Sequence, residues 1–187
     1  YARTVLSFGF TLSFVIGATI GALMIDRGFV SPELSFKAIT YFLLGKLPSC
    51  LVAFFLLLRL TFVARMDGQI FSPVRHIAAS VWVGLLGWEL AMLGSMLGLL
   101  CGLLVVDPEE IHAIWAYLSV EYDMTLALRG LVRTVLHAMA LSWLLYFESV
   151  VMAYWQSDKE TRMTQFIFLG LLTLISIEVL DTVLFLN

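Results

Sequence analysis

The chain has 187 residues, of which 61% are hydrophobic and 13% charged, and its mean hydropathy is +0.97. Values this high are typical of polytopic membrane proteins and exclude an ordinary soluble domain. The formal net charge is −3. Because Lys and Arg form no cluster that would follow a phosphate backbone, nucleic acid is excluded as a partner.

The first apolar stretch, residues 5–25, contains no charged side chain and is long enough to span a bilayer. Gly17 and Gly21 form a GxxxG motif in it, which indicates close packing against another helix. A turn rich in charged residues follows, and the second expected span covers residues 34–64. Pro48 lies near its middle, so we expect a kink there.

The third expected span, residues 77–106, is thirty residues long and has a single ionisable side chain, Glu89. This length indicates a tilted span or one with an extra turn. Glycines recur every four residues along it and give the helix one smooth side for the approach of a second backbone. These glycines are Gly94, Gly98 and Gly102.

Residues 107–123 carry five acidic side chains and no Lys or Arg, with apolar residues at helical spacing. This pattern predicts an amphipathic helix at the membrane surface. Glu109 and His112 within it form an isolated ExxH, which does not make a di-iron site without a second copy. Two further spans are expected at residues 126–154 and 165–186, so the chain is predicted to be a single all-α domain with five transmembrane helices.

Five spans place the two termini on opposite sides of the membrane, and the distribution of Lys and Arg decides their orientation. More of the basic residues outside the spans lie on the side that holds the N-terminus and the links after spans two and four. The acidic segment after span three lies on the other side. We therefore predict a cytoplasmic N-terminus and a C-terminus on the outer side. The basic residues on the cytoplasmic side are Arg3, Arg65, Arg75, Lys159 and Arg162.

Ionisable residues at membrane depth are candidates for function, because each is costly unless it is paired or hydrated. Arg129, Arg133 and His137 repeat every four residues and share one face of span four. Glu178 and Asp181 share a face of span five. Since these spans are antiparallel, the acids and bases lie at the same outer depth, and we expect ion pairs between them. Two interpretations stay open: a polar lining for a lipid headgroup or ion, or a bridge that fixes the two helices.

Three more charged residues lie within the spans. Lys46 and Glu89 approach each other from opposite ends of spans two and three, so we expect an ion pair or a shared cavity lining. Glu148, in span four, has Arg59 and Lys159 as its nearest candidate partners, or else lines a hydrated cavity.

No catalytic motif or metal-ligand spacing is present, so neither a catalytic residue nor a cofactor is predicted. Cys50 and Cys101 lie alone in apolar runs and are expected to be small core residues. An intramembrane enzyme or a proton-coupled carrier using Glu89 and Glu148 is disfavoured, because neither carboxylate has a second catalytic group nearby. In a carrier Glu89→Gln would remove activity, whereas in a bridge to Lys46 it would reduce stability.

Several stretches together resemble the MlaE-type permeases, the membrane subunits of MCE-associated lipid-transporting ABC systems. The last two spans are similar in order and character, beginning with LRGLVRTVLHAMALSWLLYFESVVMAYW. VIGATIG resembles the GxxxG motif in the first span of this family. The Gly-rich third span resembles the third span of the family. LLGKLPSCLVAFFLLLRL is similar to a family segment in which Lys46 stands at a Glu and Arg59 at an Arg. Ser72 and Pro73 match the family's entry into span three.

The resemblance covers essentially the whole chain and implies an MlaE-like permease fold in a bacterial inner membrane. It further implies a phospholipid substrate, a homodimer or heterodimer packed along the glycine-bearing helices, an ATPase on the inner side and an MCE-domain protein on the outer side. Any ATP hydrolysis would belong to the partner. In this interpretation the charged residues shape the cavity and its helix contacts.

One departure from the family concerns the link between spans two and three. The family has a long link there, whose acidic helix docks on the ATPase, whereas residues 65–76 are too few to form one. The Gly-rich link before the last span is likewise replaced, by QSDKETRMT. The alternative is therefore a structural or assembly subunit that keeps an MlaE-like fold within a larger membrane complex and does not transport.

Overall fold

The computed structural model describes residues 2–26, 41–66, 73–106, 124–152 and 158–185. These residues form helices and no strand. Five of the helical segments are long and apolar enough to cross a membrane. The described part of the chain is therefore all-helical and contains five candidate membrane spans, as the sequence predicts.

Two of the helical segments are extended by a short π-helical turn, labelled η. The elements in chain order are α1 (Ala2–Asp26), η1 (Tyr41–Lys46), α3 (Leu47–Met66), α4 (Pro73–Val106), α6 (Met124–Phe147), η2 (Glu148–Met152) and α8 (Lys159–Phe185). The expected surface helix at residues 107–123 lies outside the described residues.

The last helix begins earlier than the sequence indicates, at Lys159 rather than at residue 165. Asp158 precedes it, and its carboxylate accepts hydrogen bonds from the backbone N–H groups of Glu160 and Thr161, each at 3.3 Å. An Asp in this position satisfies amide groups that have no partner within the helix. The polar residues that look like a link are thus the first turns of α8.

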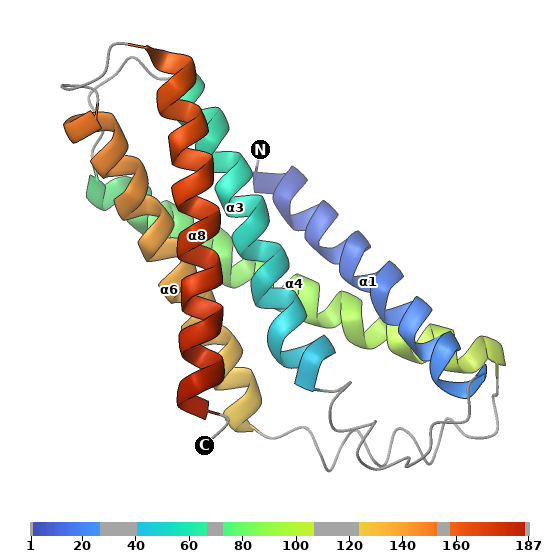
Figure 1. Cartoon of the computed structure of the whole chain (residues 1–187). Coiled ribbons are helices and arrows are strands. Elements are labelled where there is room, and N and C mark those ends of the chain that lie inside the picture. The colour runs from blue at the N-terminus through green and yellow to red at the C-terminus, as the bar shows by residue number, and fades with distance from the viewer. Residues whose placement is uncertain (1, 27–40, 67–72, 107–123, 153–157, 186–187) are drawn as a thin grey trace.

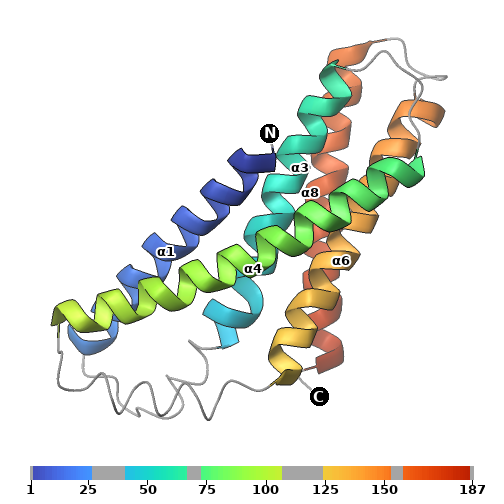
Figure 2. The ribbon, with the colours of Figure 1, turned by 180° about the vertical axis from the view of Figure 1, so that it is seen from behind.

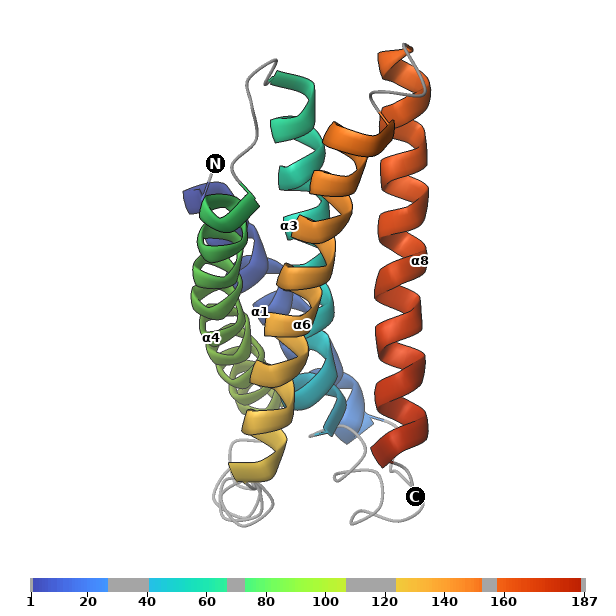
Figure 3. The same ribbon diagram turned by 90° about the vertical axis from the view of Figure 1, so that its left-hand side faces the viewer.

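Successive spans alternate in direction, so the two ends of the chain lie towards opposite ends of the bundle (Figure 1). α1 and α4 lie side by side and cross the other helices obliquely, whereas α3, α6 and α8 stand more upright (Figure 2). Viewed from the side, α8 forms one edge of the molecule, and α1 with α4 form the opposite edge (Figure 3).

Glycines hold α1 against α4. A Cβ atom built on Gly98 would lie 2.1 Å from the Phe14 carbonyl oxygen, and one built on Gly102 would lie 2.2 Å from that of Ala18. The two backbones are therefore in direct contact, which only a residue without a side chain permits. The other three predicted packing glycines lie in the same contact. Gly17 and Gly21 face the backbone of α4, and Gly94 faces the backbone of α1.

The main apolar core lies between α3, α4 and α6. Leu56, Ala138, Leu141 and Leu145 are completely buried in it, and Trp88 is 5% exposed. α8 contributes far less to the interior. Only 11% of the apolar stretch of α8 is buried, compared with 53% of the apolar stretch that η1 and α3 form together.

Candidate functional site

A group of polar side chains joins α8 to α3 and α6 within the spanning segments. We call it the polar cluster. Four of its members carry formal charges, two positive and two negative. Its members are Lys46, Ser49, Arg133, His137, Glu178, Asp181 and Thr182.

Arg133 is the centre of the polar cluster, and its side chain is 3% exposed. One terminal nitrogen donates to Asp181, while the other donates to the Gly45 carbonyl at 3.3 Å and lies 3.5 Å from the Ser49 hydroxyl. The expected ion pair between the two last spans is thus present. Arg133 connects three elements, because its partners lie on η1, α3 and α8.

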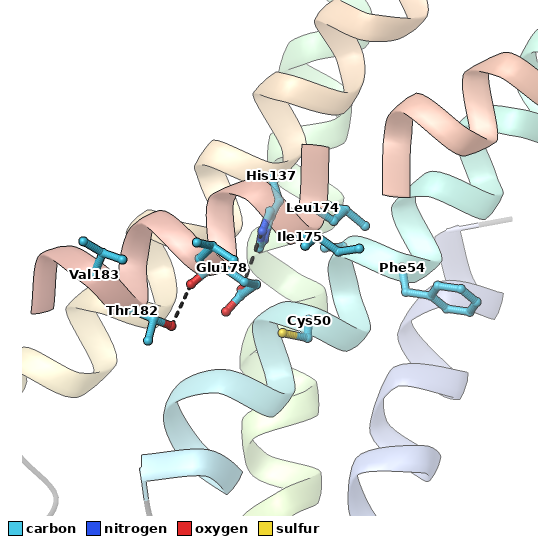
Figure 4. Close-up of a pocket in the computed structure, with 10 residues that line it drawn as sticks. Cys50, Phe54, His137, Leu174, Ile175, Glu178, Thr182 and Val183 are labelled. Carbon is cyan, nitrogen blue, oxygen red and sulfur yellow. Dashed lines mark hydrogen bonds and ion pairs between the residues drawn. The ribbon is translucent and has the colours of Figure 1, made fainter. Parts of the chain in front are cut away.

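Glu178 lies between two donors without forming a hydrogen bond to either. Its Oε1 atom is 3.7 Å from Nε of Arg133 and 3.6 Å from Nε2 of His137. His137 is completely buried, and neither ring nitrogen has a hydrogen-bond partner. Figure 4 shows the imidazole pointing towards the Glu178 carboxylate. The Oε1 atom of Glu178 and the imidazole of His137 are therefore buried without a hydrogen-bond partner.

Lys46 completes the polar cluster from the first turn of the second span. Its ammonium group donates to the Thr182 hydroxyl at 2.8 Å and lies 5.8 Å from the centroid of the Tyr41 ring. Lys46 ends the π-helical turn η1, just before Pro48, whose missing N–H interrupts regular helical hydrogen bonding. π-Helical turns are frequent at functional sites. The irregularity near Pro48 thus delivers both Lys46 and the Gly45 carbonyl to α8.

Two cavities flank α8 on either side of the polar cluster. The first, of about 480 Å³, lies between α3 and α8, and its lining includes Cys50, Phe54, His137 and Glu178. The second, of about 730 Å³, lies between α6 and α8. It combines charged side chains with an apolar wall. Its lining includes Arg129, Arg133, Asp181, Leu128, Val132, Leu136 and Leu180.

At the other end of α8 the structure forms a second polar contact with α6. Arg162 Nε lies 3.9 Å from Glu148 Oε1, and both side chains are largely buried. The sequence suggests Arg59 or Lys159 as the partner of Glu148. The contact with Arg162 exists because α8 begins at Lys159, which places residue 162 on the first turn of the helix, level with η2.

The expected pairing of Lys46 with Glu89 is wrong. Lys46 is turned towards Thr182, and Glu89 is exposed on the outside of α4. Distance from the helix ends sets the depth of a residue, but its rotation about the helix axis decides what it faces. The two residues lie on helices that pack together, yet they point in different directions.

Three further predicted residues have separate positions. Arg59 lies on α3 away from the polar cluster, and its NH1 atom is buried without a hydrogen-bond partner. Cys50 is half-buried and lines the first cavity, as described above. Cys101 is exposed on α4, so its expected place in the core is wrong. Residues that sequence reasoning missed are Ser49 and Thr182. The sequence contains a signal for both: Ser49 follows Lys46 by three residues and Thr182 follows Glu178 by four, so each shares a helix face with a charged residue.

In the ranges that the structure describes, no three His, Cys, Asp or Glu side chains converge as metal ligands. Arg133 pairs with Asp181 and lies near Glu178, Lys46 donates to the Thr182 hydroxyl, and these groups adjoin two largely apolar cavities. The chain matches no protein-family model, and no curated protein or solved structure is significantly similar to it.

Proposed function

We propose that the chain is the permease subunit of a phospholipid transport system and performs no catalysis itself. The observation that carries this proposal is the pair of apolar cavities beside α8, with the polar cluster between them. Both volumes fall within the range of ordinary small-molecule sites, about 300 to 1,000 Å³. The resemblance to MlaE-type permeases, although no sequence comparison supports it, points to the same class of ligand.

The cavity between α6 and α8 is the better candidate for the lipid. Arg129 and Arg133 supply guanidinium groups, which are suited to phosphate oxygens because of their planar, forked arrangement of donors. Leu128, Val132 and Leu136 lie at helical spacing along the same wall and provide an apolar surface for an acyl chain. A phospholipid would then place its phosphate near Arg129 and its chain along α6.

The small buried area of α8 supports a role for this helix in admitting the ligand. A helix that contributes little to the core is displaced from its neighbours at lower cost than one that is fully packed. The ion pairs of α8 lie in the polar cluster and in the Glu148 to Arg162 pair, and Phe166 anchors the helix in the apolar core. In the proposed system an ATPase on the inner side and an MCE-domain protein on the outer side would act through such a helix.

A photoreactive phospholipid with a diazirine in one acyl chain tests the lipid site. The purified chain is reconstituted in vesicles containing the probe, irradiated and digested, and adducts on α6 and α8 are located by mass spectrometry. Leu180→Trp fills the cavity between α6 and α8, and we expect it to reduce labelling several-fold. Leu172→Trp is the matched control, because Leu172 is similarly exposed on α8 but lines neither cavity. Equal labelling of both variants would contradict the lipid site.

The second candidate is a non-transporting assembly subunit. The observation that favours it is the short link between α3 and α4. α3 ends at Met66 and α4 begins at Pro73, so a long coupling helix of the kind that docks on an ATPase has no room there. Purification from the native membrane in a mild detergent separates the candidates. Stoichiometric recovery of an ATPase and an MCE-domain protein supports transport, whereas a large assembly containing neither supports the scaffold.

A further inference from the structure

Glu89 occupies an unusual place for a carboxylate. It lies halfway along α4, roughly 25 Å from either end at a rise of about 1.5 Å per residue. A helix of this length crosses the membrane with both ends outside the hydrocarbon region. Glu89 is therefore near the middle of the bilayer.

The side chain points away from the rest of the chain. The residues on its own face of α4 are Trp82, Leu86, Leu93 and Leu97, which are 66%, 45%, 48% and 47% exposed. Apart from Glu89, this face is apolar over at least four turns. The helix α4 itself lies at the opposite edge of the molecule from α8, which carries part of the polar cluster (Figure 3).

Glu89 differs from the other charged residues of the described ranges. Those that are exposed lie at the ends of helices: Arg3, Asp158 and Glu160. Arg133 and Asp181, which lie deep in their spans, are turned inwards and paired with each other. A charged side chain at the centre of a membrane helix is costly unless it is paired or hydrated. The position therefore requires a compensating group.

Among the described residues, that group does not come from Lys46 or Arg133, the bases deep in neighbouring spans. Lys46 donates to Thr182, and Arg133 is surrounded by its partners on η1, α3 and α8. A lipid headgroup lies too far away to reach the middle of the bilayer. A second copy docked symmetrically through this face would place one Glu89 against the other, because a two-fold interface joins identical patches. Charge complementarity points to a base on another protein.

We propose that the outer face of α4 around Glu89 binds a transmembrane helix of a different protein, and that this helix carries a Lys or Arg at the same depth. The leucines on either side of Glu89 provide the apolar contact, and the ion pair sets the register of the two helices. The proposal does not depend on the function proposed above, because this face is separate from the cavities beside α8.

A defined peptide probe tests the charge requirement. Fluorescent polyleucine transmembrane peptides with Lys, Leu or Glu at the central position are mixed with the labelled full chain in vesicles, and energy transfer gives the association. Polar contacts between membrane helices contribute about 0.6 kcal/mol on average and up to about 1.7 kcal/mol, which corresponds to roughly three- to sixteenfold in affinity. We expect the affinity of the Lys peptide for the wild-type chain to exceed its affinity for the Glu89→Gln variant by a factor in this range. Leu97→Gln, on the same face, is the control and retains the preference.

The result that overturns the proposal is an equal affinity of the Lys and Leu peptides for the wild-type chain. Self-association of the chain that disappears in Glu89→Gln would also overturn it, in favour of a second copy. Because Glu89 is exposed and forms no hydrogen bond or ion pair with another described residue, an unchanged unfolding transition of Glu89→Gln verifies that the fold is intact.

Labelling with dicyclohexylcarbodiimide, which modifies protonated carboxyl groups in apolar surroundings, provides a second measurement. We expect Glu89 to be protected in native membranes and to react after the chain is purified and reconstituted alone. Equal reaction in both preparations would mean that Glu89 faces lipid as a protonated acid, and it would contradict the presence of a basic partner.

Discussion

The contact of α1 with α4 and the contact of α6 with α8 join pairs of apolar helices by opposite means. In the first, glycines let one backbone touch the other, with positions such as Gly98 directly opposite a carbonyl group. In the second, Arg133 and its carboxylate partners hold helices that leave cavities between them. In lipid, apolar side chains gain little by leaving the solvent, so helix association depends on close packing or on polar contacts. The glycine contact between α1 and α4 is therefore close-packed, whereas the polar contact between α6 and α8 leaves a cavity beside it.

The largest effect is expected from Arg133→Met, which tests the polar contact. The substitution leaves Glu178 and Asp181 in the membrane without their shared cation. Removing one member of a buried ion pair costs about 3–5 kcal/mol. We expect a loss of this size in the free energy of unfolding, measured by titration with sodium dodecyl sulfate in mixed micelles.

Neutralising the acids as well provides the control for Arg133→Met. The triple variant with Glu178→Gln and Asp181→Asn contains no uncompensated carboxylate, so it should recover much of the lost stability. A triple variant less stable than the single one would show that the charges are not the cause.

The next largest effect is expected from Gly98→Ala, which tests the glycine contact. The added Cβ would lie 2.1 Å from the Phe14 carbonyl oxygen, so α1 must move away from α4. Overpacking of this kind costs about 1–3 kcal/mol. Gly84→Ala in the same helix is the matched control, because its Cβ meets side-chain methyl groups and no backbone: those of Leu56 and Thr134 at 3.4 Å and of Ala138 at 3.6 Å. Equal losses in the two variants would refute a specific backbone contact.

A smaller effect is expected at the edge of the polar cluster, where Lys46 donates to Thr182. Lys46→Met and Thr182→Val each remove this hydrogen bond, and a net contribution of about 1 kcal/mol is typical. The double-mutant cycle isolates the pairwise free energy. We expect a coupling of about this size between the two substitutions, and additive losses would exclude a direct contact.

The smallest effect is expected outside the membrane, at Asp158. The Thr161 hydroxyl and the backbone N–H groups of Glu160 and Thr161 donate to this carboxylate and hold its pKa below the ordinary value of 3.8. A lowered pKa stabilises the folded state above pH 3.8, and this stabilisation is lost as the pH falls through the folded pKa. Stability measured across this window should fall less steeply in Asp158→Asn, which caps the helix without titrating. An identical slope would contradict the contribution of Asp158.

Much of the arrangement along each helix follows from the sequence, because hydropathy locates the spans and a spacing of three or four places side chains on one face. The contact of Arg133 with Asp181 needs only this spacing and the antiparallel order of the last two spans. Lys46 could not be placed in the same way. Its partner depends on how η1 and α3 are rotated, and the π-helical turn changes that rotation by an amount that no local residue pattern specifies.

The cavities were even less accessible to sequence reasoning. They lie between α8 and its neighbours, and their volume depends on how closely α8 approaches α3 and α6, which no local residue pattern specifies. The start of α8 was missed for a different reason, since Asp158 caps a turn that reads as a charged link. The capping signal was present in the sequence, as an Asp immediately before a run of helix-forming residues.

The order of charges along the chain has a consequence for how the protein is made. Lys46 and Arg133 belong to spans that are synthesised before α8, the helix that carries Glu178 and Asp181. During biogenesis the basic spans therefore enter the membrane before their acidic counterparts exist. A chain that stops before residue 158 retains these unpaired bases, so quality-control proteases should recognise it, whereas completion of the last helix neutralises them.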